Sequence, residues 1–526
     1  MLFAASRLSA ASAEPATQPV TTIVIHADQP IGPISPWIYG TNQPANDPPS
    51  RYTFIRQGGN RMTAYNWENN ASNAGADWHH QNDAFLSESD VPGETVRVAA
   101  AKALANGQTF IATVPIGDYV AADKRGDGDV KGSGPDYLSK RFHRSVPSQT
   151  DAKTMPPTTR PDAGDDVVAQ DAFVSWLEKA FPSAARKSGA RIAYALDNEP
   201  DIWVGTHARI HPEPVTYAEL IDRNIKYASA IKAVAPDALV FGFVSYGWGG
   251  FTTLQNAPDG AGRDATEVYL GAMKKAEADG GRRLIDVLDV HWYSEARGGG
   301  TEQTGVRVSE IGPRAGEVAV NEARVHATRS LWDPTYRETS WIDRSLGEPI
   351  RLIPRLRAKI DAHYPGTKLA MTEYNYGGGE NASGAVAQAD ALGIFGREGV
   401  FAAAFWALSD KEPFSRAAFD AYRNYDGHGR AFGETALRVD NGDPAMLGAF
   451  ASAREGDGAT VIVLTNRTTN ERTTRLDVRG VAVTDFGRWQ LTGATAAMTS
   501  GSDGPIEKNS LPLTLPAMSV TTIELK

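Results

Sequence analysis

Residues 192–200 read Ile-Ala-Tyr-Ala-Leu-Asp-Asn-Glu-Pro, an apolar run that closes on Glu199 and Pro200. A second run, Leu369 to Thr372, closes on Glu373. Short apolar runs bounded by polar residues are typical of strands buried on both faces of a parallel sheet. If both strands belong to one parallel barrel, the two glutamates reach the same end of it, because all strands of such a barrel point the same way.

Further β-rich runs flank these two and alternate with helical patterns, which favours a parallel sheet with crossover helices. With them the chain has eight runs, the number that a closed (β/α)8 barrel needs. We therefore predict an α/β fold with a (β/α)8 TIM barrel over residues 37–431. The eight predicted strands are Trp37–Gly40, Phe54–Gly59, Phe110–Pro115, Ile192–Leu196, Leu239–Ser245, Val287–Trp292, Leu369–Glu373 and Ala402–Ala407.

Helix signals fill several of the gaps between these runs. Thr216 with Glu219 forms a capping-box pattern, and Asp264 with Glu267 starts a second helix. Apolar residues from Ile350 to Ile360 predict a third. The gap between the first two strands leaves little room for a helix, so an irregular crossover is expected there.

Two long insertions, Asp118 to Asp166 and Ser294 to Leu346, follow predicted strand ends. Long loops at this end of a barrel commonly shape a binding cleft, so both are expected on the active-site face.

The pattern changes near Phe432 to short alternating runs separated by turn residues, which predicts a smaller antiparallel β-sandwich. Val20 to His26 is also strand-like, and a lone strand cannot bury its apolar face. We therefore assign residues 20–36 and 432–526 to this second domain. The predicted C-terminal strands are Met446–Ala451, Thr460–Thr465, Thr474–Val478, Arg488–Leu491, Leu511–Leu515 and Ser519–Leu525.

Residues 1–19 are interpreted as an N-terminal tail or the remnant of an export signal. Ala11-Ser12-Ala13 resembles a signal-peptidase site, but the apolar stretch before it is short and Arg7 interrupts it. On this basis we expect a secreted protein, extracellular or periplasmic.

Composition narrows the classes of partner. The 526 residues include 53 basic and 63 acidic side chains, a formal net charge of −10, which disfavours nucleic acid and anionic membrane surfaces. No run of about 20 apolar residues exists, so no membrane span is expected. The absence of cysteine excludes disulfides and zinc–thiolate sites. A monomer acting on a neutral polymer fits these features.

The two glutamates suggest a chemistry. Two facing carboxyl groups are what hydrolysis of a glycosidic bond requires. One group must be protonated to donate to the departing oxygen, and the other must be ionised to attack the anomeric carbon. The residues alone do not say which of Glu199 and Glu373 has which role.

Aromatic and polar residues near the predicted strand ends are candidates for binding sugar. Sugar rings stack on aromatic faces, and Trp67 and Trp406 are the favoured platforms, although core packing is the alternative for each aromatic taken singly. The amide of Asn198 could hold a sugar hydroxyl, while His291 and Arg61 have either a binding or a structural role. The full set of predicted binding residues is Trp67, Asn198, Tyr246, His291, Tyr293, Tyr374, Trp406 and Arg61.

Asp123, Asp127 and Asp129 lie in a glycine-rich loop that could take a calcium ion. The spacing does not match an EF-hand, because Gly134 stands where the bidentate glutamate would be. A solvated loop is the alternative interpretation. No cofactor is required for the predicted chemistry, and no metal is assigned to the catalytic site.

The segment from Gly58 to Trp78, which contains Gly-Gly-Asn-Arg-Met-Thr-Ala-Tyr-Asn-Trp-Glu-Asn-Asn, resembles glycoside hydrolase family 44. Asp197–Trp203, Asp289–Tyr293 and Thr372–Asn375 are similar to motifs of the same family in the same order. The resemblance extends over essentially the whole chain after about residue 20.

The resemblance implies a (β/α)8 barrel with a β-sandwich built from both chain ends. It also implies hydrolysis with retention of configuration, with Glu199 as acid/base and Glu373 as nucleophile. Its members cleave internal β-1,4-glucan bonds, often including xyloglucan, and some carry calcium. Two alternatives stay open at this stage: another retaining barrel glycosidase, such as a xylanase or arabinofuranosidase, and a non-catalytic carbohydrate-binding protein.

Overall fold

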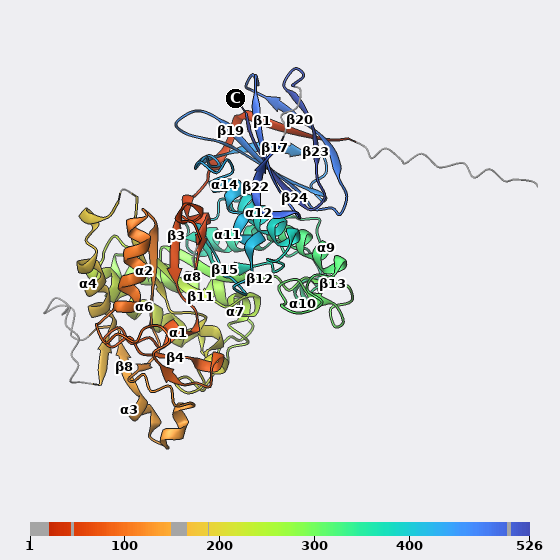
Figure 1. The fold of residues 1–526 in the computed structure, drawn as a ribbon. Coiled ribbons are helices and arrows are strands. Elements are labelled where there is room, and N and C mark those ends of the chain that lie inside the picture. Colours follow the sequence, from red (N-terminus) through yellow and green to blue (C-terminus); the bar gives the residue numbers. More distant parts are fainter. Residues whose placement is uncertain (1–19, 44–46, 149–165, 188, 502–505, 526) are drawn as a thin grey trace, which may run out of the picture.

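The chain forms an α/β barrel with a separate β-sheet domain packed against it (Figure 1). The structure is a computed structural model that describes residues 20–43, 47–148, 166–187, 189–501 and 506–525. The predicted N-terminal tail, residues 1–19, lies outside the described residues, as do residues 149–165 of the first predicted insertion.

The barrel is closed by eight parallel strands, which confirms the predicted fold class. Each predicted strand run corresponds to an observed strand, with ends shifted by a few residues; the first run is mostly a 3-10 turn before a two-residue strand. In chain order the strands are β2 (Gly40–Thr41), β3 (Phe54–Gln57), β6 (Thr109–Val114), β10 (Ile192–Leu196), β11 (Val240–Ser245), β12 (Val287–Tyr293), β15 (Lys368–Asn375) and β16 (Ala402–Phe405).

Helices cover the outside of the barrel between successive strands. The predicted caps are present: Thr216 accepts a hydrogen bond from the N–H of Glu219, and Asp264 accepts one from the N–H of Glu267. In the described part of the β2–β3 crossover the only helix is a short 3-10 turn, Pro49–Arg51, as expected. The covering helices are α2 (Glu94–Ala105), α4 (Gln170–Ala180), α6 (Tyr217–Val234), α8 (Ala265–Gly280), α11 (Leu352–His363) and α12 (Ala382–Arg397).

Long connections follow β3, β6, β10, β11 and β12, all at the carboxyl end of the barrel. Their short strands and helices build the rim of the barrel mouth. These elements are α1 (Asn60–Thr63), β4 (Ser72–Asn73), β5 (Asn82–Asp83), β7 (Tyr119–Ala121), α3 (Tyr137–Arg141), β8 (Phe142–Val146), β9 (Val167–Ala169), α5 (Trp203–Thr206), α7 (Trp248–Thr253), β13 (Arg297–Gly298), β14 (Val306–Arg307), α9 (Val318–Ala327) and α10 (Trp341–Leu346). After β16, α13 (Pro413–Ala417) and α14 (Asp420–Arg423) lead to the second domain.

The second domain is the predicted smaller, largely antiparallel β domain: nine strands are hydrogen-bonded in one order, and residues of eight of them share one apolar core. Figure 1 shows the N-terminal strand β1 lying among the C-terminal strands. β1 pairs antiparallel with β17 and parallel with β20, so the two chain ends meet here. The sequence missed β17 and β22. The strands are β1 (Thr21–Pro33), β17 (Thr435–Asn441), β18 (Leu447–Ala453), β19 (Thr460–Asn466), β20 (Arg472–Arg479), β21 (Phe486–Thr492), β22 (Thr495–Ser500), β23 (Ser510–Leu515) and β24 (Ser519–Leu525).

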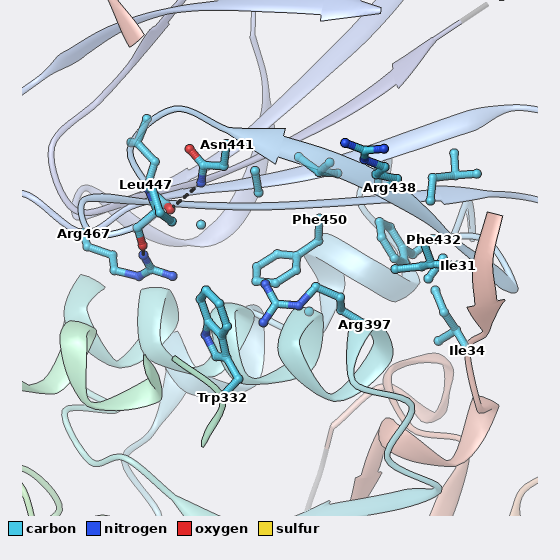
Figure 2. Close-up of a pocket in the computed structure, with 18 residues that line it drawn as sticks. Ile31, Ile34, Trp332, Arg397, Phe432, Arg438, Asn441, Leu447, Phe450 and Arg467 are labelled. Atoms are coloured by element: carbon cyan, nitrogen blue, oxygen red, sulfur yellow. Dashed lines mark hydrogen bonds between the residues drawn. The ribbon is translucent and has the colours of Figure 1, made fainter. Parts of the chain in front are cut away.

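Helix α12 joins the two domains, because it lies between the barrel and the sheet and is buried at every residue from Ser383 to Gly396. Gly393 permits this close approach, since a Cβ there would lie 2.3 Å from the ring of Phe450 on β18. Beside this contact a pocket of about 280 Å³ opens between α12 and the sheet, with Trp332, Arg397 and Phe450 on its wall (Figure 2).

Candidate active site

Glu199 stands at the carboxyl end of β10, on the first residue of a turn into a 3-10 helix. Its backbone is left-handed, with φ 49° and ψ 55°, a conformation that costs a non-glycine residue about 1–3 kcal/mol. Pro200 excludes ordinary helical geometry at the preceding residue. The carboxylate of Asp197 braces the turn by accepting the N–H groups of Ile116 and Asn198 at 2.7 and 2.8 Å.

Glu373 lies on β15, where a β-bulge turns it into the barrel. Asp289 pairs with Ala370 and His291 pairs with Glu373, so three steps along β15 match two along β12. An extra residue of this kind reverses the side to which the following residues point, and bulges are frequent beside active sites. The bulge therefore turns Glu373 to the side on which Thr372 already lies, toward His291.

Both oxygens of Glu373 accept hydrogen bonds. Arg56, fully buried on β3, donates from Nη1 to Oε1 at 2.8 Å, and the hydroxyl of Tyr293 donates to Oε2 at 2.8 Å. An ionised carboxylate is an acceptor at both oxygens, so this environment suits a charged Glu373. Burial, followed by the charge of Glu373, raises the pKa of Tyr293 and keeps its hydroxyl a donor.

The two glutamates face each other across His291. One oxygen of Glu199, one oxygen of Glu373 and one ring nitrogen of His291 all lie within 4.8 Å of one another. Retaining glycosidases hold their two carboxyl groups roughly 5–5.5 Å apart, while inverting enzymes need about 6.5–9.5 Å to admit a water. The spacing of the Glu199 and Glu373 oxygens is therefore closer to that of retaining enzymes than to that of inverting enzymes.

Burial raises the pKa of Glu199 to about 8; the Arg56 guanidinium opposes this shift and the charge of Asp77 adds to it. Burial also lowers the pKa of His291 to about 4, so its ring is neutral near pH 7. A carboxyl group with this pKa is protonated at neutral pH, as a general acid must be.

Neighbouring hydrogen bonds select the tautomer of His291. The hydroxyl of Thr372 donates to Asp289 at 2.7 Å, so its oxygen can only accept from Nε2 of His291, 3.4 Å away. Nδ1 is then free of hydrogen and lies 2.7 Å from Oε1 of Glu199. The proton in that contact therefore comes from the carboxyl group of Glu199.

Asn198 is buried beside Glu199 and connects it to the loop after β3. Its side-chain oxygen accepts from Arg56 at 2.9 Å and from the N–H of Gly59 at 3.1 Å, and its Nδ2 donates to Asn60 at 3.4 Å. Asn198 thus fixes Arg56 and Glu199 relative to each other, in addition to any contact with sugar.

Two residues predicted to bind substrate are core residues instead. Trp67 is only 1% exposed and packs against Phe173 and Trp176, with ring centroids 6.0 Å away in each case. Tyr374 is fully buried on the outer side of β15, where Gln388 donates to its hydroxyl at 2.6 Å. Neither ring faces the barrel mouth, so Trp67 is no sugar platform.

The other predicted binding residues lie at or near the mouth. Trp406 is partly exposed and lies against the backbone of Gly59, where a Cβ would be 2.6 Å from its ring. Tyr246 is 42% exposed after β11. Arg61 is turned away from the glutamates and pairs with Asp83 at 2.6 Å.

Exposed aromatic side chains lie in the connections that follow barrel strands. Four aromatic side chains among the described residues are more than a third exposed, and all four lie in connections that follow barrel strands. Only Tyr246 was among the predicted binding residues. The four are Trp78 (56%), Phe85 (73%), Tyr246 (42%) and Trp341 (38%).

The predicted acidic loop is held by arginines. Arg141, whose side chain is buried, donates to Asp123 and Asp127, and Arg209 donates to Asp129. Within the described residues, the one group of three side chains spaced to share a metal ion is Glu199, His291 and Glu373. Arg56 already occupies one oxygen of Glu373 there, and a proton joins Glu199 to His291.

Sequence reasoning missed Arg56, Asp289 and Thr372. Arg56 did carry a signal, because a charged side chain inside an apolar barrel strand needs a buried partner of opposite charge. Asp289 carries the same signal on β12. Thr372 had none, since a threonine is ordinary in a strand.

A buried pair of carboxyl groups at the mouth of a (β/α)8 barrel, one protonated and one paired with arginine, is the arrangement of a glycoside hydrolase. The model of glycoside hydrolase family 44 matches residues 71–296. Endoglucanase A of Paenibacillus lautus is 38% identical over 96% of this chain and 72% of its own length. The chain belongs to glycoside hydrolase family 44.

Solved structures agree with this assignment. A family 44 xyloglucanase from Paenibacillus polymyxa, solved with xyloglucan, is 37% identical, with a TM-score of 0.88 over 96% of this chain and 99% of that one. The family 44 endoglucanase Cel44A of Clostridium thermocellum gives the same identity and TM-score over 96% and 100%.

Proposed function

We propose that this glycoside hydrolase cleaves internal β-1,4-glucosidic bonds of cellulose-type glucans, and of xyloglucan, with retention of configuration. The single observation that carries the mechanism is the spacing of Glu199 and Glu373, within 4.8 Å across His291. The names of the relatives, endoglucanase and xyloglucanase, support the substrate class.

In the first step Glu373 attacks the anomeric carbon and forms a glycosyl ester. The bond from that carbon to the leaving oxygen breaks, and the proton of Glu199 moves to this oxygen. Arg56 and Tyr293 hold the attacking carboxylate in place. Before substrate binds, Nδ1 of the neutral His291 ring accepts a hydrogen bond from the protonated carboxyl group of Glu199, which orients the acid.

In the second step Glu199, now a carboxylate, takes a proton from water. The resulting hydroxide attacks the anomeric carbon and the ester bond to Glu373 breaks, so both carboxyl groups return to their starting states. Two inversions at one carbon give net retention.

The barrel mouth suits a polymer rather than a small glycoside. Exposed aromatic rings stand on the connections after β3, β11 and β12, so sugars could be contacted well away from the glutamates. We further propose that the protein is a secreted monomer. No helix among the described residues is long and apolar enough to cross a membrane.

Glutamine variants test the two roles separately. Glu373→Gln removes the nucleophile and should lower kcat about 10²- to 10⁴-fold or more on every substrate. Glu199→Gln should lose activity on carboxymethyl cellulose and xyloglucan equally, yet form the glycosyl ester rapidly from dinitrophenyl β-cellobioside, whose leaving group needs no proton.

Stopped-flow release of dinitrophenol measures that first step, and circular dichroism checks that both variants fold. Equal loss of the dinitrophenol burst in both variants would contradict the assignment of Glu199. A product time course on xyloglucan, carboxymethyl cellulose and xylan separates the proposed substrate class from a xylanase.

A further inference from the structure

Phe85, in the connection between β5 and α2, has the most exposed aromatic ring among the described residues, at 73%. Scattered apolar side chains are ordinary on a protein surface, but Val91 of the same connection and Trp78, just before β5, are exposed as well, at 59% and 56%. Three large apolar side chains within fourteen positions are thus exposed after barrel strand β3.

The ring of Phe85 is held in place from behind. The guanidinium of Arg61 lies 4.1 Å from the ring centroid, a cation–π contact. Asp83 fixes that guanidinium at 2.6 Å, and the ion pair is mostly buried, with side-chain exposures of 15% for Arg61 and 11% for Asp83. The backbone N–H of Phe85 also donates to Asp83 at 3.1 Å. One face of the ring is therefore supported, while most of the ring is open to solvent.

This connection is tied to the catalytic centre by short polar contacts. Asn198, next to Glu199, donates to Asn60, and Asn60 donates to Asp77 at 3.0 Å. Arg61 directly follows Asn60 in helix α1. Phe85 thus belongs to the same rim as the two glutamates but lies outside the buried centre.

We propose that Phe85, supported by Arg61, is a stacking platform for a glucosyl unit of the polymer outside the cleavage position. Its role is to favour long chains over short ones. A ring whose orientation is fixed before binding loses little conformational entropy when sugar stacks on it, so its contribution appears in the affinity for polymer. This inference rests on the proposed endoglucanase function.

The test compares a polymer with a short substrate in the full chain. Phe85→Ala should raise KM for carboxymethyl cellulose about five- to tenfold, because the loss of one aromatic contact weakens binding by about this factor. The value of kcat should stay within about twofold of wild type. The kinetics of nitrophenyl β-cellobioside should not change, because it does not extend beyond the buried centre. Phe85→Tyr should retain the wild-type KM for polymer.

Val91→Ala is the matched control, since it removes another exposed apolar side chain of the same connection, and it should leave KM unchanged. The inference is overturned if Phe85→Ala leaves KM for polymer unchanged, or if both substrates lose activity in parallel. Failure of the wild-type protein to cleave either substrate would instead refute the proposed function.

Discussion

At the scale of single residues, the proposed chemistry depends on a difference between two carboxyl groups of the same type. Glu199 is buried next to a neutral histidine, and burial raises its pKa to about 8. Glu373 is equally buried but has a guanidinium and a hydroxyl as donors. The protein thus keeps one acid and one base within 4.8 Å.

The pKa of Glu199 predicts the alkaline limb of the pH profile. Only the protonated form can donate to the leaving oxygen, so kcat/KM should fall as the pH rises through about 8. Initial rates on carboxymethyl cellulose between pH 5 and 10 measure this limb. A profile already falling below pH 6 would contradict the protonated state of Glu199.

A variant of Asp77 tests how a nearby negative charge shifts the pKa of Glu199. The negative charge of Asp77 raises the pKa of Glu199, so Asp77→Asn should move the alkaline limb to lower pH. Asp77 is exposed, so added salt should shrink the difference between variant and wild type.

At the scale of elements, buried strands were predictable and their local irregularities were not. Both ends of the strand Ile192–Leu196 were predicted correctly. In such a barrel, an apolar run bounded by polar residues is stable as a buried strand. Glu373 was a sequence candidate for the site, although strict alternation from Ala370 would have pointed it outward and Tyr374 inward. The bulge between β12 and β15 reverses this, and nothing in the sequence marks it.

In loops, the sequence does not show which side chains are buried, and Trp67 is an example. Its neighbours Phe173 and Trp176 lie more than a hundred positions away on α4, so only the folded chain reveals that its ring is buried. A solvent-facing tryptophan and a buried one look alike in the sequence.

The core position of Trp67 predicts a loss of stability rather than of binding. Trp67→Ala should lower the free energy of unfolding by roughly 3–5 kcal/mol, because a large cavity opens beside Phe173 and Trp176 of α4. Guanidinium unfolding followed by circular dichroism measures this, with Trp67→Phe as the milder control. A raised KM at unchanged stability would instead indicate a sugar platform.

At the scale of the whole molecule, the sheet domain is joined to the barrel by a buried ion pair. Asp390 on α12 and Arg467 after β19 lie 2.6 Å apart, with side-chain exposures of 0% and 2%. Thr328 and Thr465 donate to the same carboxylate at 2.8 and 2.6 Å. The pair lies at the domain interface, beside the pocket of Figure 2.

Breaking this pair should destabilise the protein more than removing it. Arg467→Ala leaves a buried, unpaired carboxylate and should cost roughly 3–5 kcal/mol, whereas Asp390→Asn combined with Arg467→Met should recover part of that loss. Calorimetric unfolding gives the comparison, and kcat/KM at 25 °C should stay near the wild-type value. A loss below about 1 kcal/mol in Arg467→Ala would show that the pair does not join the domains.

The central claim is that Glu373 forms the bond to sugar while Glu199 carries the proton. Incubation with a 2-deoxy-2-fluoro-β-cellobioside bearing a good leaving group, followed by proteolysis and mass spectrometry, reports the attacking residue directly. The account predicts one added fluorocellobiosyl group per chain, located on Glu373. Label on Glu199, or a fully reacted inhibitor with no label on the protein, would contradict it.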